Sequence, residues 1–372
     1  MKLGIQLRFI SFVVLISLSF ASRAQIVSYG NEYLKIGSSA RGTAMGNAVV
    51  SLSSGAEALY FNPANITKLT NTFDITATHS EYFGDMANYD FVSIAFRNDT
   101  NSAIALGFVR FGVDNIPNTL YIYNNGTFDL NAIQYFSVSD NAVFLGYSRR
   151  YTDKLNIGGT LKIIYRHQGQ FANAYGFGLD LGASYKYKDW ILSAIARDAL
   201  GTYTAWFFST DSVMASVFAQ TGNDLPHNKI EVTLPWLTLS LAREFTIKSL
   251  YHIRTELDLV NYFEGRGSGI INTPLFNSSP QIGLEADYKK IIFIRMGAYN
   301  FQRLPYYRNG TYSTKINFFP SLGIGLKYKT VELDYSFGNF YNPGFGLSTH
   351  FFSIRIEPKH VKLPKFLDAK VF

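Results

Sequence analysis

The amino-acid sequence predicts an all-β fold, namely a 14-stranded antiparallel transmembrane β-barrel with an N-terminal plug segment. Three observations support this prediction. Polar and apolar residues alternate with a period of two over most of the chain, and tight turns alternate with long connections. The chain is 16% aromatic and only 16% charged, whereas soluble domains are about 25% charged. This composition requires an apolar exterior as well as a filled interior.

Residues 1–24 predict a cleaved signal peptide. Lys2 and Arg8 precede an apolar run from Phe9 to Ala21, and small residues flank Arg23. A basic, then an apolar, then a small-residue region is typical of secretory signals. The apolar run is shorter than the roughly 20 residues that a membrane-spanning helix needs. We expect the mature chain to begin at Gln25, and no later window is apolar enough for such a helix.

Residues 25–71 precede the first predicted strand and are rich in Ala, Gly and Ser. A phosphate-binding loop needs Gly-Lys-Ser/Thr, and a dinucleotide fingerprint needs GxGxxG after a buried strand. Neither pattern is present. A barrel of this size has a lumen too wide for its wall side chains to fill. The segment therefore predicts a plug whose small residues approach a glycine-rich inner wall closely.

Alternation over residues 72–356 predicts the strands of the barrel. In AYGFGLDLGASYKY, residues 174–187, aromatic and aliphatic side chains alternate with small or charged ones. Successive side chains of a strand point to opposite faces, so such a strand has one wholly apolar face. The predicted strands are 72–83, 89–98, 102–112, 141–151, 155–167, 174–187, 189–198, 230–244, 250–262, 280–288, 291–301, 318–328, 331–338 and 348–356.

The connections fall into two classes that alternate along the chain. Tight turns are predicted at Asn98–Asn101, Thr152–Lys154, Tyr187–Asp189, Thr246–Ser249, Tyr288–Lys290 and Tyr328–Thr330. Long loops are predicted near 113–140, 199–229, 263–279 and 302–317. The alternation is regular if 128–140 belongs to a loop rather than to the wall.

An even strand number, strands of about 9–11 residues and short turns on one side are typical of bacterial outer-membrane barrels. The sheet must close, because an open edge in hydrocarbon leaves backbone N–H and C=O groups unpaired. We therefore expect contact with outer-membrane lipid and both termini in the periplasm. The stretch 357–372 is predicted to be a periplasmic C-terminal tail.

The plug segment carries a recognisable signature. The stretches YLKIGSSARGTAMGNAVVSL (33–52) and EALYFNPANI (57–66) resemble the N-terminus of the PorV/PorQ family of outer-membrane proteins. That family is similar to the FadL-like fatty-acid channels, whose N-terminal hatch also carries an Asn-Pro-Ala element. This chain departs from the pattern at Ser38-Ser39, Gly55-Ala56 and Asn65. The plug motif comprises Gly37, Arg41, Met45, Gly46, Tyr60, Asn62, Pro63 and Ala64.

The resemblance implies a role in the type IX secretion system of Bacteroidetes-type bacteria. PorV-like barrels bind secreted cargo through its C-terminal signal domain, and PorQ-like barrels attach to the surface machinery. The implied partners are therefore type IX components and cargo signal domains. The subfamily is left open by the departures noted above.

The sequence offers no pattern that predicts an enzyme, a cofactor or a metal. It has no cysteine, its six His residues show no ligand spacing, and no GxSxG element is present. The net charge of +7 is spread along the chain, so it does not predict nucleic-acid binding.

Charged residues on the inward faces of the strands admit two interpretations. They could include a catalytic carboxylate pair, but a salt-bridge network that holds the plug is the better hypothesis. The predicted lumen charges are Arg254, Glu256, Asp258, Glu285, Asp287, Arg295, Glu332 and Asp334.

Loop 199–229 contains more apolar residues than a solvated loop should expose. We expect it to contact a partner, the membrane surface or the barrel mouth through Trp206, Phe207, Phe208, Met214, Val217 and Phe218. The leading hypothesis is a protein-binding barrel in type IX secretion. The alternative is a FadL-like channel for a hydrophobic small molecule, gated by Asn62-Pro63-Ala64. A third hypothesis is a structural barrel without a transport role.

Overall fold

The computed structural model describes residues 30–82, 84, 86–124, 127–263, 269–308, 311–338 and 349–358. The predicted signal peptide (1–24) and all but the first two residues of the predicted C-terminal tail lie outside these ranges. Fourteen strands close into an antiparallel barrel, so the predicted fold class and strand number are confirmed. Within the described ranges, no helix has both the length and the hydropathy needed to cross a bilayer.

The ring follows the order of the chain, and each strand pairs with its neighbours. Closure occurs where the last strand pairs with the first, from Ile75 opposite Ile356 to Glu81 opposite His350. The wall strands are β1 (Phe73–Tyr82), β2 (Ala87–Arg97), β3 (Ser102–Asn118), β6 (Gln134–Arg150), β7 (Leu155–Gln168), β8 (Ala172–Tyr187), β9 (Trp190–Arg197), β12 (Trp236–Ile247), β13 (Tyr251–Tyr262), β15 (Asn277–Tyr288), β16 (Ile292–Arg308), β17 (Thr311–Tyr328), β18 (Val331–Gly338) and β19 (Thr349–Ile356).

One end of the barrel, which we call the turn side, carries the tight connections. Several of their residues adopt left-handed backbone conformations, including Lys188, Lys248 and Lys289 with φ of 55°, 50° and 54°. Positive φ in such short connections, of two residues at Lys188 and three at Lys248 and Lys289, matches the twist of the flanking strands. The opposite end, which we call the loop side, carries the long connections.

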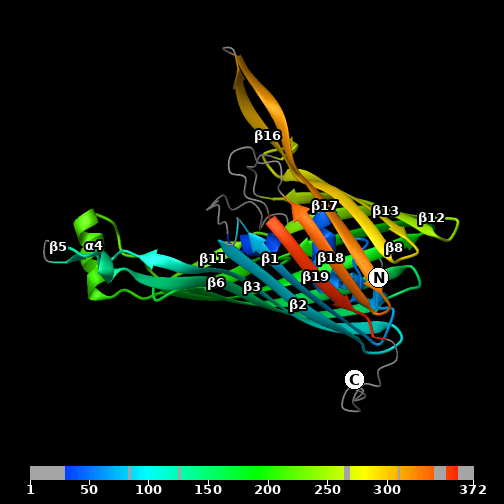
Figure 1. The fold of residues 1–372 in the computed structure, drawn as a ribbon, viewed down its shortest axis with the longest axis horizontal. Helices are drawn as coiled ribbons and strands as arrows, with labels where there is room; N and C mark the ends of the chain where they lie inside the picture. Colours follow the sequence, from blue (N-terminus) through cyan, green and yellow to red (C-terminus); the bar gives the residue numbers. More distant parts are fainter. Residues whose placement is uncertain are drawn as a thin grey trace, which may run out of the picture.

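Two predicted loops are in large part strand, which corrects their assignment. β3 continues to Asn118 and β6 begins at Gln134, with a register shift between Val113 and Ile116, so much of 113–140 is paired. The segment 302–317 belongs to β16 and β17, which pair to Arg308 opposite Thr311 beyond a shift between Tyr299 and Gln302. Beyond this shift, residues 302–308 of β16 and 311–317 of β17 form a two-stranded projection that extends away from the barrel (Figure 1). We call it the β16–β17 projection.

The remaining long connections contain short elements. The segment 199–229 holds β10 (Thr202–Phe208), α4 (Ser212–Thr221) and the start of β11 (Lys229–Thr233), and β10 pairs with both β8 and β11. Segment 263–279 holds β14 (Ile271–Asn272) and the start of β15. The tip of the β3–β6 hairpin holds β4 (Tyr123–Asn124), β5 (Thr127–Phe128) and η3 (Leu130–Ala132). α4 lies beside this tip (Figure 1), where the Tyr121 hydroxyl donates to Asp211 at 2.8 Å.

The two faces of the wall differ as alternation requires. In β17, Ser321, Gly323 and Gly325 face the lumen and are buried, whereas Leu322 and Ile324 are exposed on the exterior. Exposed Leu, Ile, Phe and Tyr side chains recur on the exterior of the other wall strands. Such an apolar outer band around a closed barrel is what contact with hydrocarbon demands.

Ile324→Arg tests whether this band faces lipid. Ile324 is 60% exposed within the band, and Ile316 is 53% exposed on the same strand but on the β16–β17 projection. Placing Arg in hydrocarbon should lower the free energy of unfolding in lipid vesicles by about 2–4 kcal/mol. Ile316→Arg, measured by the same urea titration, should change it little. Equal losses from the two substitutions would contradict a lipid-facing band.

Candidate functional site: a plugged lumen between two cavities

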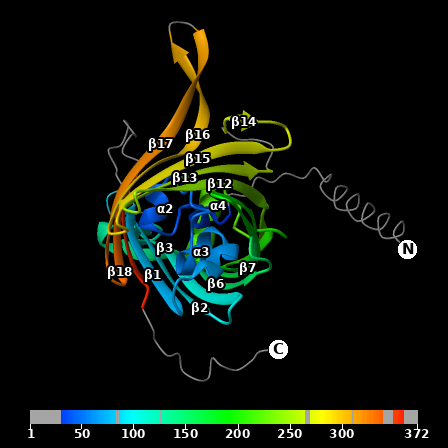
Figure 2. The ribbon, with the colours of Figure 1, turned by 90° about the vertical axis from the view of Figure 1, so that its right-hand side faces the viewer.

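The lumen is occupied by the N-terminal segment, which forms four short helical elements. They are η1 (Glu32–Lys35), α2 (Ala40–Ala44), α3 (Gly55–Phe61) and η2 (Pro63–Lys68). α2 and α3 are encircled by the wall strands (Figure 2). Local capping explains where two of them begin, because Ser39 accepts from the Gly42 backbone N–H at 2.9 Å and Asn62 from that of Ala64 at 3.1 Å.

Glycines of the wall allow the plug backbone to touch it. Met45 is fully buried, and Gly46, with φ of 64°, lies against the backbone of Ala298. A Cβ on Gly297 would collide with the Gly46 nitrogen and the Met45 carbonyl carbon. On the far side of the lumen, the Asn62-Pro63 step abuts glycines of β7 and β8. The small residues therefore permit contact without a gap.

An apolar cluster fills the space between α3 and the wall strands β2, β3 and β6. Leu59 and Tyr60 of α3 are buried against the inward-facing rings of Phe91 and Phe144. The Tyr60 ring centroid lies 5.8 Å from that of Phe91 and 6.3 Å from that of Phe144, both edge-to-face. The Tyr60 hydroxyl donates to the Leu34 carbonyl at 2.8 Å and accepts from the Gly37 N–H at 3.1 Å. Tyr60 thus ties η1 to α3 inside the lumen.

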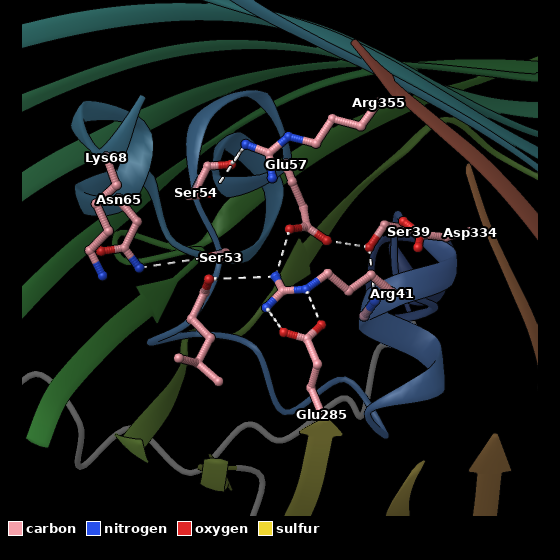
Figure 3. Close-up of polar contacts among 12 residues, drawn as sticks. Ser39, Arg41, Ser53, Ser54, Glu57, Asn65, Lys68, Glu285, Asp334 and Arg355 are labelled. Carbon is pink, nitrogen blue, oxygen red and sulfur yellow. Dashed lines mark hydrogen bonds and ion pairs between the residues drawn. The ribbon is translucent and has the colours of Figure 1, made fainter. Parts of the chain in front are cut away.

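Arg41 joins the plug to the wall through buried carboxylates (Figure 3). Its Nε lies 2.8 Å from Glu285 of β15, and its Nη1 lies 3.1 Å from Glu57 of α3. Glu285 also forms ion pairs with Arg254 at 2.7 Å and with Arg295 at 2.6 Å. Glu285 is therefore the common acceptor of one plug arginine and two wall arginines.

The network continues around the lumen. Arg295 is 1% exposed and also pairs with Asp334 at 2.5 Å and Glu332 at 3.1 Å on β18. Arg254 pairs in addition with Asp287 at 2.9 Å. Removing any partner from such a cluster leaves a buried charge uncompensated, so the cluster specifies one seating of the plug.

Glu256 forms a second anchor. It accepts from the backbone N–H groups of Ser51 at 2.6 Å and Leu52 at 3.0 Å, and from the Ser240 hydroxyl at 2.7 Å. Asp258 follows on the same inward face, is fully buried and lies next to Glu256.

The structure places the eight predicted plug-motif residues in the lumen and all eight predicted lumen charges on the inward face of the wall. Four of these charges, namely Arg254, Glu285, Arg295 and Asp334, join the network around Arg41. Asp287 and Glu332 extend it, and Glu256, which binds the Ser51 backbone N–H, lies next to Asp258.

Sequence reasoning missed three charged groups that hold the plug at the barrel seam. Arg355 of β19 pairs with Asp74 of β1 at 2.6 Å and donates to the Ser54 hydroxyl at 3.1 Å. Asp74 in turn accepts from the Ala56 N–H at 3.0 Å, and Glu57 accepts from the Ser39 hydroxyl at 2.5 Å. In FDITATHS, Asp74 lies on the same face of the strand as Thr76 and Thr78, and this polar face is the signal that predicts its lumen location.

A further buried cluster was also missed. Lys162 of β7 pairs with Asp180 of β8 at 2.7 Å and with Asp198, which follows β9. Asp198 has φ of 49° and its backbone N–H donates to Asp180 at 2.8 Å. Beside this cluster, β10 replaces β9 as the partner of β8.

The predicted partner-contact residues are divided between β10 and α4, and they differ in exposure. Trp206 lies in β10 and is buried on the lumen side. Its indole N–H donates to Glu231 at 2.7 Å, and the Arg166 guanidinium lies 4.8 Å from its ring centroid. Met214 is also buried. The exposed member is Phe207 on the exterior, and the partly buried members are Phe208, Val217 and Phe218.

Two cavities lie on opposite sides of the plug. The loop-side cavity has a volume of about 340 Å³ and is bordered by Lys35, Thr43 and Asn47 of the plug. The turn-side cavity has a volume of about 850 Å³ and is bordered by Arg41, Ser51 and Lys68. Across the described ranges, no group of three or more His, Asp or Glu side chains is placed to hold a metal ion.

Solved structures share this fold at low sequence identity. The CymD monoaromatic hydrocarbon channel has a TM-score of 0.54 at 12% identity, covering 87% of this chain and 98% of that chain. The toluene transporter TodX of Pseudomonas putida has a TM-score of 0.50 at 13% identity, covering 86% and 96%. TbuX of Ralstonia pickettii, also a toluene transporter, has a TM-score of 0.50 at 12% identity, covering 86% and 98%.

These likenesses show the fold alone, which is a barrel of FadL type. No family model matches the chain, and no curated protein sequence matches it.

Arg41→Met should loosen the plug. It leaves Glu57 and Glu285 without a cation from the plug, and loss of one partner from a buried pair typically costs about 3–5 kcal/mol. We expect lower thermal stability and a higher ion conductance in planar bilayers. Arg110→Met is the matched control, because its 3.7 Å pair with Asp114 on β3 is more exposed and should contribute at most about 1 kcal/mol. Unchanged conductance in Arg41→Met would refute the role of the network in seating the plug.

Proposed function

We propose that this chain is an outer-membrane channel that takes up a small hydrophobic compound, with the loop-side cavity as its first binding site. The observation that carries the proposal is the lining of that cavity. Its rings are Tyr82, Tyr262, Tyr299, Phe319 and Phe351. A cavity of about 340 Å³ lies within the roughly 300–1,000 Å³ typical of small-molecule sites, which are usually lined by apolar and aromatic groups.

The rings are held in pairs by the wall. Tyr82 and Phe351, on neighbouring strands β1 and β19, meet edge-to-face with centroids 5.5 Å apart. Tyr299 and Phe319, on β16 and β17, do the same at 5.8 Å. Polar groups come from the plug, where Lys35 lies 4.9 Å from the Tyr262 ring centroid. An apolar wall facing a polar floor suits a compound that is hydrophobic with a small polar handle.

The fold supports the same proposal. Proteins described as a monoaromatic hydrocarbon channel and as toluene transporters share the barrel architecture. In the present conformation the plug closes the lumen, so transport requires part of it to move. We assign that movement to the segment around Asn62-Pro63-Ala64, and we orient the turn side toward the periplasm.

A second candidate function is protein binding in type IX secretion, which the PorV/PorQ resemblance implies. The β16–β17 projection favours it. Tyr307 and Tyr312 are 61% and 80% exposed, their ring centroids lie 4.8 Å apart, and no described segment packs over them. Exposed paired tyrosines on a projecting ribbon are typical of protein contact sites.

Ser279→Phe tests the channel proposal. Ser279 borders the loop-side cavity from the inward face of β15, so a phenyl group there should fill the site. Uptake of labelled toluene or long-chain fatty acid by cells should fall about tenfold, as expected when a ligand loses its pocket. Ser313→Phe on the exposed projection is the control and should transport normally. The proposal fails if wild-type cells take up no more of either compound than cells carrying an empty vector.

Replacing Tyr307 and Tyr312 together by Ala tests the second candidate. The double variant should assemble but lose co-purification with type IX components, because the projection loses both rings of its exposed pair. Replacing Tyr288 and Tyr328, which are exposed on the exterior at the turn side, is the matched control. Retention of the same components by the double variant would remove the projection from this role.

A further inference from the structure

The turn-side cavity, which we call the vestibule, opens between the tight turns and has the plug as its floor. Its volume is about 850 Å³. It is bordered by plug residues such as Ser51 and Lys68 and by residues at the turn-side ends of β6, β8, β15 and β17. None of the aromatic rings of the loop-side cavity borders it.

The glutamates that border the vestibule are already paired. Each one lies within ion-pair distance of an arginine, and the pairs are Glu285–Arg41 at 2.8 Å, Glu332–Arg295 at 3.1 Å, Glu244–Arg254 at 3.2 Å and Glu357–Arg355 at 3.2 Å. The remaining carboxylate, Asp153, is exposed in the β6–β7 turn. The acidic groups therefore offer little compensation to further cations at the rim.

Six cationic side chains that border the same vestibule make no ion pair with any residue in the described part of the chain. They are Lys68, Arg150, Lys154, Lys186, Lys290 and Lys329. One comes from the plug and the others come from turns or strand ends around the rim. The β6–β7 turn is joined to the end of β8, because the Lys186 backbone N–H donates to the Lys154 carbonyl at 2.8 Å.

Lys68 is a cation of the vestibule whose charged form is disfavoured by burial. Its ammonium donates to the Ser51 carbonyl at 2.8 Å, a neutral acceptor. Burial lowers the pKa of Lys68 to about 8, a shift that Glu256 and Glu244 oppose and Lys186 reinforces. An anionic group beside Lys68 would oppose the effect of burial and favour the charged form.

We propose that the vestibule binds an acidic peptide segment presented from the turn side. Carboxylates form short, charge-assisted hydrogen bonds with Lys and Arg, which the rim cations otherwise lack. The cations are distributed around several turns, so one small anion cannot contact them all. An extended segment with several Asp or Glu side chains can reach them and can fill a volume that is many times the roughly 30 Å³ of one water molecule.

Binding of a fluorescent oligoglutamate peptide to the purified full chain in nanodiscs tests the proposal. Fluorescence anisotropy should show saturable binding that weakens as salt is added. The variant Lys154→Gln/Lys186→Gln/Lys290→Gln should bind at least about tenfold more weakly, as expected when three charge contacts are lost. The matched control is Lys188→Gln/Lys248→Gln/Lys289→Gln, which removes the same charge from side chains on the same side that do not border the vestibule.

A second measurement separates binding in the vestibule from general attraction to a basic surface. Peptide affinity should fall as the pH rises through about 8, where Lys68 loses its charge, and Lys68→Gln should abolish this step. Equal weakening by the two triple variants would overturn the proposal, as would the absence of binding to the wild-type chain. Binding of citrate without binding of the peptide would also overturn it, because a small anion would then be the ligand. These outcomes are independent of hydrocarbon uptake.

Discussion

The need to satisfy every backbone hydrogen bond in hydrocarbon determines the rest of this structure. It forces the sheet to close, which occurs through the pairing of β19 with β1. A closed ring of this many strands encloses more space than its own inward side chains fill. The N-terminal segment occupies that space, and the inward faces of the strands are accordingly small or charged. The glycine at 297 illustrates the constraint, because any larger side chain would meet the plug backbone.

Charge then fixes how the plug sits. An apolar plug in an apolar lumen could slide, since hydrophobic contact is not directional. Arg41 and Glu285 impose a geometry, and Arg254 and Arg295 share the same carboxylate. Buried ion pairs contribute little net stability compared with well-packed apolar groups, but breaking one is costly. The network therefore specifies position more than it adds stability.

The sequence predicts the wall better than it predicts the connections, for a physical reason. Alternation is a local signal repeated in every strand, so the number of strands and the inward location of Glu285 and Arg295 follow from it. The β16–β17 projection continues that alternation, and Asn309-Gly310 is a strong hairpin signal that was available in the sequence. The burial of Trp206 could not be predicted from the sequence, because it depends on contacts with Arg166 and Glu231, which are distant from Trp206 in the chain. Nor does any local pattern bring Asp74 to Arg355.

The closing strand β19 contacts both its neighbour in the wall and the plug. Besides its ladder with β1, β19 holds the plug directly, since the Ser353 hydroxyl accepts from the Ala40 N–H at 2.7 Å and Arg355 reaches Ser54. These contacts lie at the one place in the ring where the two ends of the sheet meet. Withdrawing the plug would therefore remove contacts that support the pairing of β19 with β1, which closes the barrel. Any displacement of the plug must leave the pairing of β19 with β1 intact, and this limits how far the plug can move.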